Sequence, residues 1–158
     1  MGHAAIDDLD RRLLALLRED GRLTNQELAE LVGLSPSQCS RRRIALEQAG
    51  LILSYQAHLS PEADGSSLLG LIEVRLARHA PDAAEALVRY VAQEPAIRDA
   101  FKVTGDHDFL IKVGVASLAE LNDLLGRLSA LGGAVAHLRT AVVLERIKEN
   151  GRMLPVGG

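Results

Sequence analysis

Aromatic residues and cysteine are both scarce in this sequence, and each scarcity excludes a class of protein. Aromatic side chains make up 3% of the 158 residues, so the hydrophobic cores must be built from leucine, valine, isoleucine and alanine. So few rings also argue against binding of single-stranded nucleic acids, where bases stack on aromatic side chains. The single cysteine, Cys39, cannot form a disulfide within the chain, which is typical of a reducing compartment.

Long apolar runs and an excess of positive charge are missing as well. No run approaches the roughly 20 apolar residues that a membrane span requires. Residues 1–17 carry three aspartates, Asp7, Asp8 and Asp10, where a secretory signal is positively charged or apolar. We therefore expect a cytoplasmic protein with no membrane partner. The net charge of −3 also means that contact with phosphates requires a local cluster of cations.

The most informative segment contains two helix starts that lie eleven positions apart. Thr24 is followed three residues later by Glu27, and Ser35 by Gln38. Both pairs fit the capping box, in which a hydroxyl and a side chain three residues on satisfy the free amides of a helix start. Residues 24–50 are therefore predicted to form a helix-turn-helix.

Glycine, proline and leucine positions complete this prediction. Pro36 suits the first position of the second helix, and Gly33 and Gly50 suit the turn and the helix end. Residues 8–20 carry leucines at helical spacing, with aspartates at the start, and predict a preceding helix. Three helices of this kind can close a small hydrophobic core.

The second half of the chain changes its hydrophobic period several times. Strand-like alternation in residues 71–76 precedes a helical run in residues 84–91. Two further strands are predicted at 97–104 and 108–115, then a helix capped by Ser117 and a strand over 135–147. This order is the βαββαβ arrangement of a ferredoxin-like domain. Its sheet has one face without helices, which we expect a partner subunit to cover.

The expected fold class is thus α+β, with two small domains. We place a helix-turn-helix domain at residues 1–52, a linker strand and hinge at 53–66, and the ferredoxin-like domain at 67–158. Turn-forming residues gather at 60–67 and mark the boundary.

The predicted second helix of the pair presents polar and cationic side chains to one side. On a helical wheel Cys39 and Leu46 lie on the core side. Arginine and glutamine make bidentate contacts with guanine and adenine in the major groove. We therefore expect base contacts from Ser37, Gln38, Ser40 and Arg41, phosphate contacts from Arg42 and Arg43, and Ser35 at the helix start. The alternative is a solvated arginine-rich face with no ligand.

Other reactive side chains offer weaker candidates. Cys39 lies among leucines on the wheel, so we expect a buried, inert thiol rather than a redox sensor. The histidines show no spacing typical of metal ligands: His58, His79, His107 and His137. We expect no metal, no other cofactor and no catalytic residue.

The turn between the two middle strands is the second candidate site. It reads Thr104, Gly105, Asp106, His107 and Asp108. Exposed amides beside glycine can receive a carboxylate while an aspartate receives an ammonium group, which together suit a zwitterionic amino acid. No nucleophile with a matching base is visible nearby. An ordinary polar hairpin turn remains the alternative.

Several motifs together resemble the Lrp/AsnC family, the feast/famine transcriptional regulators. They include Asp20-Gly21-Arg22, Val32-Gly33-Leu34-Ser35, Gly50-Leu51-Ile52, Thr104-Gly105-Asp106-His107-Asp108 and Leu131-Gly132-Gly133. The resemblance runs from about residue 6 to residue 154. It implies a winged-helix DNA-binding domain, a linker strand, and a ferredoxin-like sensing domain that forms homodimers and commonly octamers.

The resemblance also implies an amino-acid effector bound between sensing domains. Carried over, the effector site comprises the turn 104–108, with Gly133, Ala134 and Thr140 as lining. Two departures from the family pattern stand out: Arg43 replaces an apolar residue and Ile44 a charged one, and His107 replaces a common tyrosine.

We therefore predict a regulator that binds double-stranded DNA and is modulated by an amino acid. Two alternatives have the same architecture. One is an enzyme similar to the sirohaem decarboxylases, which need a tetrapyrrole pocket and can dispense with a competent recognition helix. The other is a nucleoid-organising protein with weak sequence preference.

Overall fold

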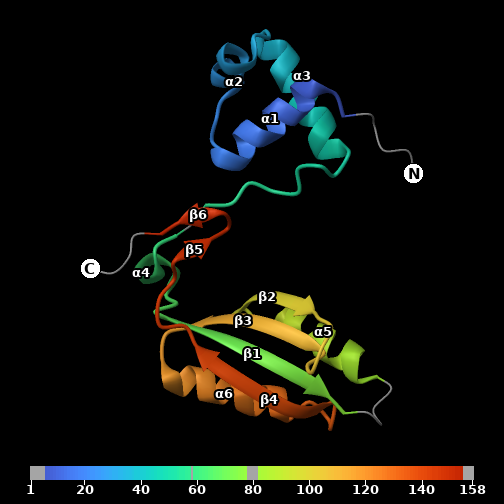
Figure 1. Ribbon diagram of the computed structural model, residues 1–158, viewed down its shortest axis with the longest axis vertical. Helices are drawn as coiled ribbons and strands as arrows, with labels where there is room; N and C mark the ends of the chain where they lie inside the picture. The colour runs from blue at the N-terminus through green and yellow to red at the C-terminus, as the bar shows by residue number, and fades with distance from the viewer. Residues whose placement is uncertain (1–5, 58, 78–81, 155–158) are drawn as a thin grey trace. The chain divides into compact units, whose positions relative to one another are not determined.

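The computed structural model describes residues 6–57, 59–77 and 82–154 of the chain (Figure 1). It divides into two compact units, residues 1–58 and residues 59–158. The predicted α+β class is confirmed: the first unit is helical, and the second combines a sheet with helices. Among the described helices, none has the length and apolar character needed to cross a membrane.

The first unit consists of three short helices, each starting at a capping box. They are α1 (Asp8–Glu19), α2 (Asn25–Val32) and α3 (Pro36–Gln48). The predicted caps of α2 and α3 are confirmed, and α1 has one as well, between Asp7 and Asp10. Gly33 adopts a left-handed conformation with φ 74°, which lets the chain turn sharply from α2 into α3.

Leucine side chains and Cys39 form the core of this unit. Leu13, Leu28 and Cys39 are fully buried, one from each helix. The expectation that Cys39 is a buried thiol is therefore confirmed. Because this core lies on one side of α3, its opposite side is left free.

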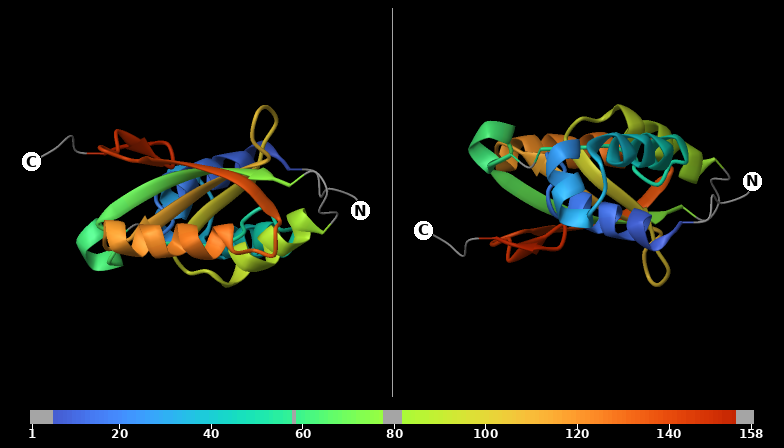
Figure 2. Two further views of the ribbon diagram at one scale, coloured as in Figure 1. Left: turned by 90° about the horizontal axis from the view of Figure 1, so that it is seen from below. Right: turned by 90° about the horizontal axis from the view of Figure 1, so that it is seen from above.

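The second unit has the predicted order of strands and helices. Its main elements are β1 (Leu68–Leu76), α5 (Ala83–Gln93), β2 (Ile97–Lys102), β3 (Phe109–Val115), α6 (Leu118–Ser129) and β4 (Val135–Val142). The four strands form one antiparallel sheet in the order β2-β3-β1-β4. Both long helices lie on the same face of the sheet (Figure 2).

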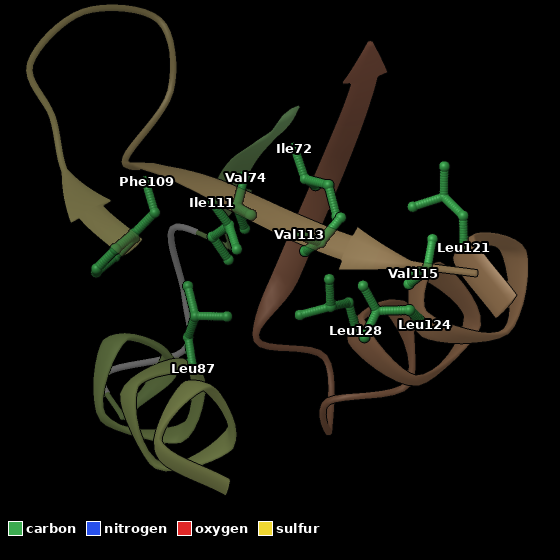
Figure 3. Packing of buried hydrophobic residues seen from close by; sticks show 10 residues of the cluster. All are labelled: Ile72, Val74, Leu87, Phe109, Ile111, Val113, Val115, Leu121, Leu124 and Leu128. Carbon is green, nitrogen blue, oxygen red and sulfur yellow. The ribbon is translucent and has the colours of Figure 1, made fainter. Parts of the chain in front are cut away.

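The core of the second unit lies between this face and the helices (Figure 3). Ile72 and Val74 of β1 are fully buried, as are Leu87 of α5 and Leu124 and Leu128 of α6. The alternation predicted for residues 71–76 is thus confirmed, since Ile72 and Val74 point to the helices. The opposite sheet face carries exposed Leu71 and Phe101.

Three short elements were not predicted. They are α4 (Pro61–Asp64) and a hairpin of β5 (Lys148–Glu149) and β6 (Arg152–Met153). The last long strand was expected to reach residue 147, but β4 ends at Val142. Val142 pairs with Gly70 near the beginning of β1, so the residues beyond it soon run out of a partner strand.

The expected linker strand also differs from the structure. The described residues of 53–66 contain no strand, and residues 61–64 form α4 instead. A strand requires a neighbour within hydrogen-bonding distance, and neither sheet of the described chain includes this segment.

Removing a core leucine is expected to destabilise the second unit. Leu124→Ala should lower the free energy of unfolding by about 2 to 5 kcal/mol, because it leaves a cavity in a fully buried site. Leu118→Ala in the same helix is the control, since Leu118 is 63% exposed. Urea unfolding followed by circular dichroism measures both, and equal losses would contradict this core.

The cap of α2 is expected to make the first unit sensitive to acid. The backbone amide of Thr24 donates to the Glu27 carboxylate at 2.7 Å, and the Thr24 hydroxyl donates to it as well, so the pKa of Glu27 lies below its ordinary value. A lowered pKa in the folded state means that this stabilisation is complete above the unfolded-state pKa. It is lost as the pH falls through the folded-state pKa.

Glu27→Gln keeps an acceptor for the cap but cannot titrate. The melting temperature of this variant should therefore fall less steeply than that of the wild type between about pH 5 and pH 2. Glu30→Gln, on the same helix but outside the cap, should follow the wild-type curve. Parallel curves for all three proteins would show that the Glu27 cap does not set the acid sensitivity.

Candidate functional site

The start of α3 is fixed by side chains that were predicted to contact DNA. The backbone amide of Ser35 donates to Gln38 Oε1 at 2.9 Å, and the backbone amide of Gln38 donates to Ser35 Oγ at 3.3 Å. The Ser35 and Ser37 hydroxyls lie 3.1 Å apart. Ser35 and the carbonyl end of Gln38 thus order the helix terminus, while the side-chain NH2 group of Gln38 keeps its donors.

Arg41 is the free cation on the open side of α3. Its side chain is exposed and forms no hydrogen bond or ion pair with any described residue of the chain. Ser37 is exposed and Ser40 half-buried on the same side of the helix, and Ile44 follows one turn after Ser40 with 49% of its surface exposed. An unpaired cation among hydroxyl groups suits a hydrogen-bonding, anionic partner.

Arg42 occupies a different environment from the one expected. Its Nη1 lies 2.8 Å from Asp7 Oδ2 and 2.7 Å from Asp10 Oδ1, the two residues that cap α1. Hydrogen bonds to Asp10 and then to Asp7 raise the pKa of Arg42. The pKa of Asp7 is lowered, first by the backbone amide of Asp10 and further by Arg42.

Arg43 is likewise engaged within the unit. Its Nε donates to the Tyr55 hydroxyl at 2.8 Å and its Nη1 to the Leu23 carbonyl at 3.0 Å. The guanidinium also lies 4.5 Å from the centre of the Tyr55 ring, a cation–π contact. The Tyr55 hydroxyl donates in turn to Glu47 at 2.8 Å. Burial, and then this bond to Glu47, raise the pKa of Tyr55.

Phosphate contacts were expected from Arg42 and Arg43, and in the structure both side chains are engaged within the first unit instead of extending into solvent. Both guanidinium groups bind acceptors within the first unit and hold α3 against α1 and against the chain on either side. The wheel placed both arginines toward the core side, but their partners Asp10 and Tyr55 lie 32 and 12 residues away. No local sequence pattern identifies partners at such separations.

The turn after β2 is held at its end by Asp108. The Val103 amide donates to the Asp108 carbonyl, and the Asp108 amide donates to the Val74 carbonyl, each at 2.9 Å. The Asp108 carboxylate accepts the Leu76 amide at 2.7 Å. Asp108 was expected to bind an effector, whereas the structure shows that its carboxylate fastens the turn to β1.

The middle of the turn is open. Thr104, Gly105 and Asp106 are exposed, and Gly105 has φ 116°, which favours glycine. The backbone amides from Thr104 to His107 donate no hydrogen bond within the described chain. The four backbone amides have unused donors that suit an anionic group, and the neighbouring Asp106 carboxylate suits a cationic group.

His107 points to a charged cluster on the helix-free face of the sheet. Its Nε2 lies 2.9 Å from Glu73 Oε2, and Arg139 Nη1 lies 3.7 Å from the same oxygen. Glu73 and Arg139 are directly opposite in the pairing of β1 with β4. Glu73 was not singled out from the sequence, because only the strand register brings it to His107.

The remaining predicted effector residues fall in two places. The Ala134 carbonyl accepts a hydrogen bond from the Ala77 amide at 2.9 Å, so Gly133 and Ala134 lie at the C-terminal end of β1. The turn 104–108 contacts the same end of β1 from the other side of the strand. Thr140 lies opposite Ile72 and therefore on the helix-covered face, away from the cluster at His107. The structure thus brings the two loops to one end of β1 but leaves Thr140 apart.

Side chains that bind metals are present among the described residues, but they are not clustered. No three His, Cys, Asp or Glu side chains gather there as metal ligands would. His58 and His79 lie outside the described residues.

Comparison with known proteins identifies both units. The family model described as winged helix-turn-helix DNA-binding matches residues 6–52, and that of the Lrp/AsnC ligand binding domain matches residues 70–153. The chain is 38% identical over 149 residues to the leucine-responsive regulatory protein of Escherichia coli K12, covering 94% of this chain and 91% of that protein.

Solved structures agree with this comparison. A transcriptional regulator from Neisseria meningitidis in complex with L-methionine has a TM-score of 0.84 and 36% identity, covering 96% of this chain and 97% of the other. A feast or famine regulatory protein from M. tuberculosis complexed with L-methionine has a TM-score of 0.82 and 31% identity, covering 96% and 100%. On these grounds, the chain belongs to the Lrp/AsnC family of transcriptional regulators.

Proposed function

We propose that the open side of α3 enters the major groove of double-stranded DNA and reads a specific sequence. The observation that carries this proposal is the contrast among three consecutive arginines. Arg42 and Arg43 are bound within the unit, and Arg41 extends from the helix unpaired. A fixed helix with one free arginine is suited to bidentate contact with guanine.

The neighbouring polar groups supply further contacts in this proposal. Ser37, Ser40 and the amide NH2 group of Gln38 lie on the same part of α3 and can donate to base edges. Ser35 contributes indirectly, because it caps the start of α3. Arg42 and Arg43 act as positioning residues, because they determine how α3 lies against the rest of the unit.

We also propose that an amino acid modulates this binding from the turn after β2. Two relatives with full-length similarity were solved with L-methionine. In this chain, the free amides of residues 104–107 suit the carboxylate of an amino acid, and Asp106 suits its ammonium group. Gly133 and Ala134 approach the same end of β1, and His107 links the turn to Glu73.

The proposed assembly is a homodimer that covers the helix-free face of the sheet, with octamers as the larger form. Leu71 and Phe101 are exposed large apolar residues on this face in the single chain. An amino acid would change DNA binding only if it bound two assemblies with different affinity. We infer binding rather than catalysis, because the chain retains an ordered helix with a free arginine for DNA.

Substitutions in the arginine cluster test the division of roles on α3. An operator is first selected from random duplexes with the full-length protein, and affinities for it and for random DNA are measured at several salt concentrations. Arg41→Ala should weaken operator binding by about 10- to 100-fold, with a much smaller loss on random DNA. Equal losses on both would favour a nucleoid-organising role with little sequence preference.

Under this proposal, Arg42→Ala should affect the stability of the first unit, whereas Arg41→Ala affects the recognition of DNA. The slope of log affinity against log salt should match the wild type, because no phosphate contact is removed, while the melting temperature of the first unit should fall. An arginine that binds phosphate would instead lower this slope by about one unit. Arg18→Ala, an exposed arginine on α1, is the control for loss of charge alone.

Two aspartates of the turn are also expected to differ, one acting in effector binding and the other in stability. Asp106→Ala should leave folding and DNA binding unchanged but raise the amino-acid concentration for a half-maximal response about tenfold or more, the effect of one charge-assisted hydrogen bond. Asp108→Ala should instead lower the free energy of unfolding by about 1 to 3 kcal/mol, because the Leu76 amide loses its acceptor.

Titration with each common amino acid, followed by sedimentation and DNA binding, measures the response to the effector. Urea unfolding of the two variants measures stability. An Asp106→Ala protein that responds like the wild type would exclude the turn as the effector site.

A further inference from the structure

Ile44 is an apolar residue in a polar setting on α3. Among the thirteen residues of this helix, all within the described chain, Ile44 is the one large apolar side chain that is exposed. Its exposed fraction is 49%, whereas Cys39 and Leu46 of the same helix are 0% and 4% exposed. Ile44 therefore adds little to the core of the first unit.

Helical geometry places Ile44 with the proposed base contacts. It lies three residues after Arg41 and seven after Ser37, spacings that bring side chains to the same side of an α-helix. At a rise of about 1.5 Å per residue, Ile44 lies about 4.5 Å beyond Arg41 along the helix axis. That distance is close to the spacing of about 3.4 Å between bases along one DNA strand.

The contacts around Ile44 leave it free to meet DNA. Glu47, one turn later, is turned toward Tyr55 and Arg43. Arg42 and Arg43, which precede Ile44, are drawn to α1 and to Tyr55. The long charged side chains of Arg42, Arg43 and Glu47 are thus held away from Ile44.

The major groove offers one apolar feature on its base edges, the 5-methyl group of thymine. We propose that Ile44 is a specificity-determining residue that packs against a thymine methyl group next to the base contacted by Arg41. This inference rests on the proposed function, because it requires that α3 enters the major groove. It adds a preference for a particular base at a position where no hydrogen bond is made.

The test replaces thymine by deoxyuridine, which lacks the methyl group but keeps every hydrogen-bonding group. Each thymine of the operator selected with the full-length protein is replaced in turn, and affinities are compared by fluorescence anisotropy. One thymine in each half-site should prove sensitive, with a loss of about three- to fivefold, the size expected for one methyl group removed from an apolar contact.

Variants at Ile44 assign that loss to this side chain. Ile44→Ser should bind the thymine and deoxyuridine duplexes equally, and Ile44→Val should retain a reduced difference. Leu31→Ser is the matched control, because Leu31 is an equally exposed residue on α2, at 50%. This control should keep the full thymine effect. Circular dichroism verifies that each variant is folded.

Each other outcome overturns the inference in a recognisable way. If no thymine is sensitive, or if the sensitivity persists in Ile44→Ser, then Ile44 does not read thymine although the chain still reads DNA. A changed molecular mass of Ile44→Ser in sedimentation would assign the side chain to a contact between subunits. If the selection enriches no sequence at all, the proposed function fails and this inference fails with it.

Discussion

The orientation of α3 depends on the two acidic residues that cap α1. Asp7 and Asp10 bind each other's backbone amides as a capping box, and both carboxylates also bind the Arg42 guanidinium. One cation therefore joins the start of α1 to the middle of α3. Because the first unit has a small core of leucines and little aromatic surface, this polar connection helps define a single packing arrangement for α3, the helix proposed to bind DNA. Arg43 does the same toward the chain after α3, through Tyr55 and Glu47. Of the three adjacent arginines, Arg42 and Arg43 are thus engaged within the first unit, and Arg41 alone has no partner among the described residues.

A comparable separation of roles exists in the second unit. Asp106 and Asp108 lie two residues apart in the same turn, yet Asp108 fastens the turn to β1 while Asp106 stays free. The turn is open because Gly105 adopts a positive φ and the amides around it have no partner in the described chain. The turn lies at the end of β1, where Ala134 also meets the strand, and under the proposed function an effector bound there acts on the sheet that is proposed to join the subunits.

Local signals in the sequence were sufficient for most of the fold. The hydroxyl and carboxyl spacing at Thr24 and Ser35 predicted two helix starts, and alternation around Ile72 and Val74 predicted the buried face of β1. Features that depend on contacts between distant residues were not predictable: the partners of Arg42 and Arg43, the pairing of His107 with Glu73, and the end of β4, where β1 ceases to provide a partner. The hydrophobic periodicity predicts which helices and strands form. It does not specify the strand register or the contacts between side chains that are far apart in the sequence. The exposure of Ile44, which suggests a thymine contact, likewise became visible only once the helix was packed.

The central claim is that α3 binds DNA with Arg41 free and Arg42 held by α1. A crystal structure of the full-length protein on its selected operator tests this claim most directly. We predict that the Arg41 guanidinium contacts a guanine edge in the major groove, while Arg42 stays within hydrogen-bonding distance of Asp7 and Asp10. A structure in which Arg42 leaves the two aspartates to bind a phosphate, with Arg41 in solvent, would contradict the account.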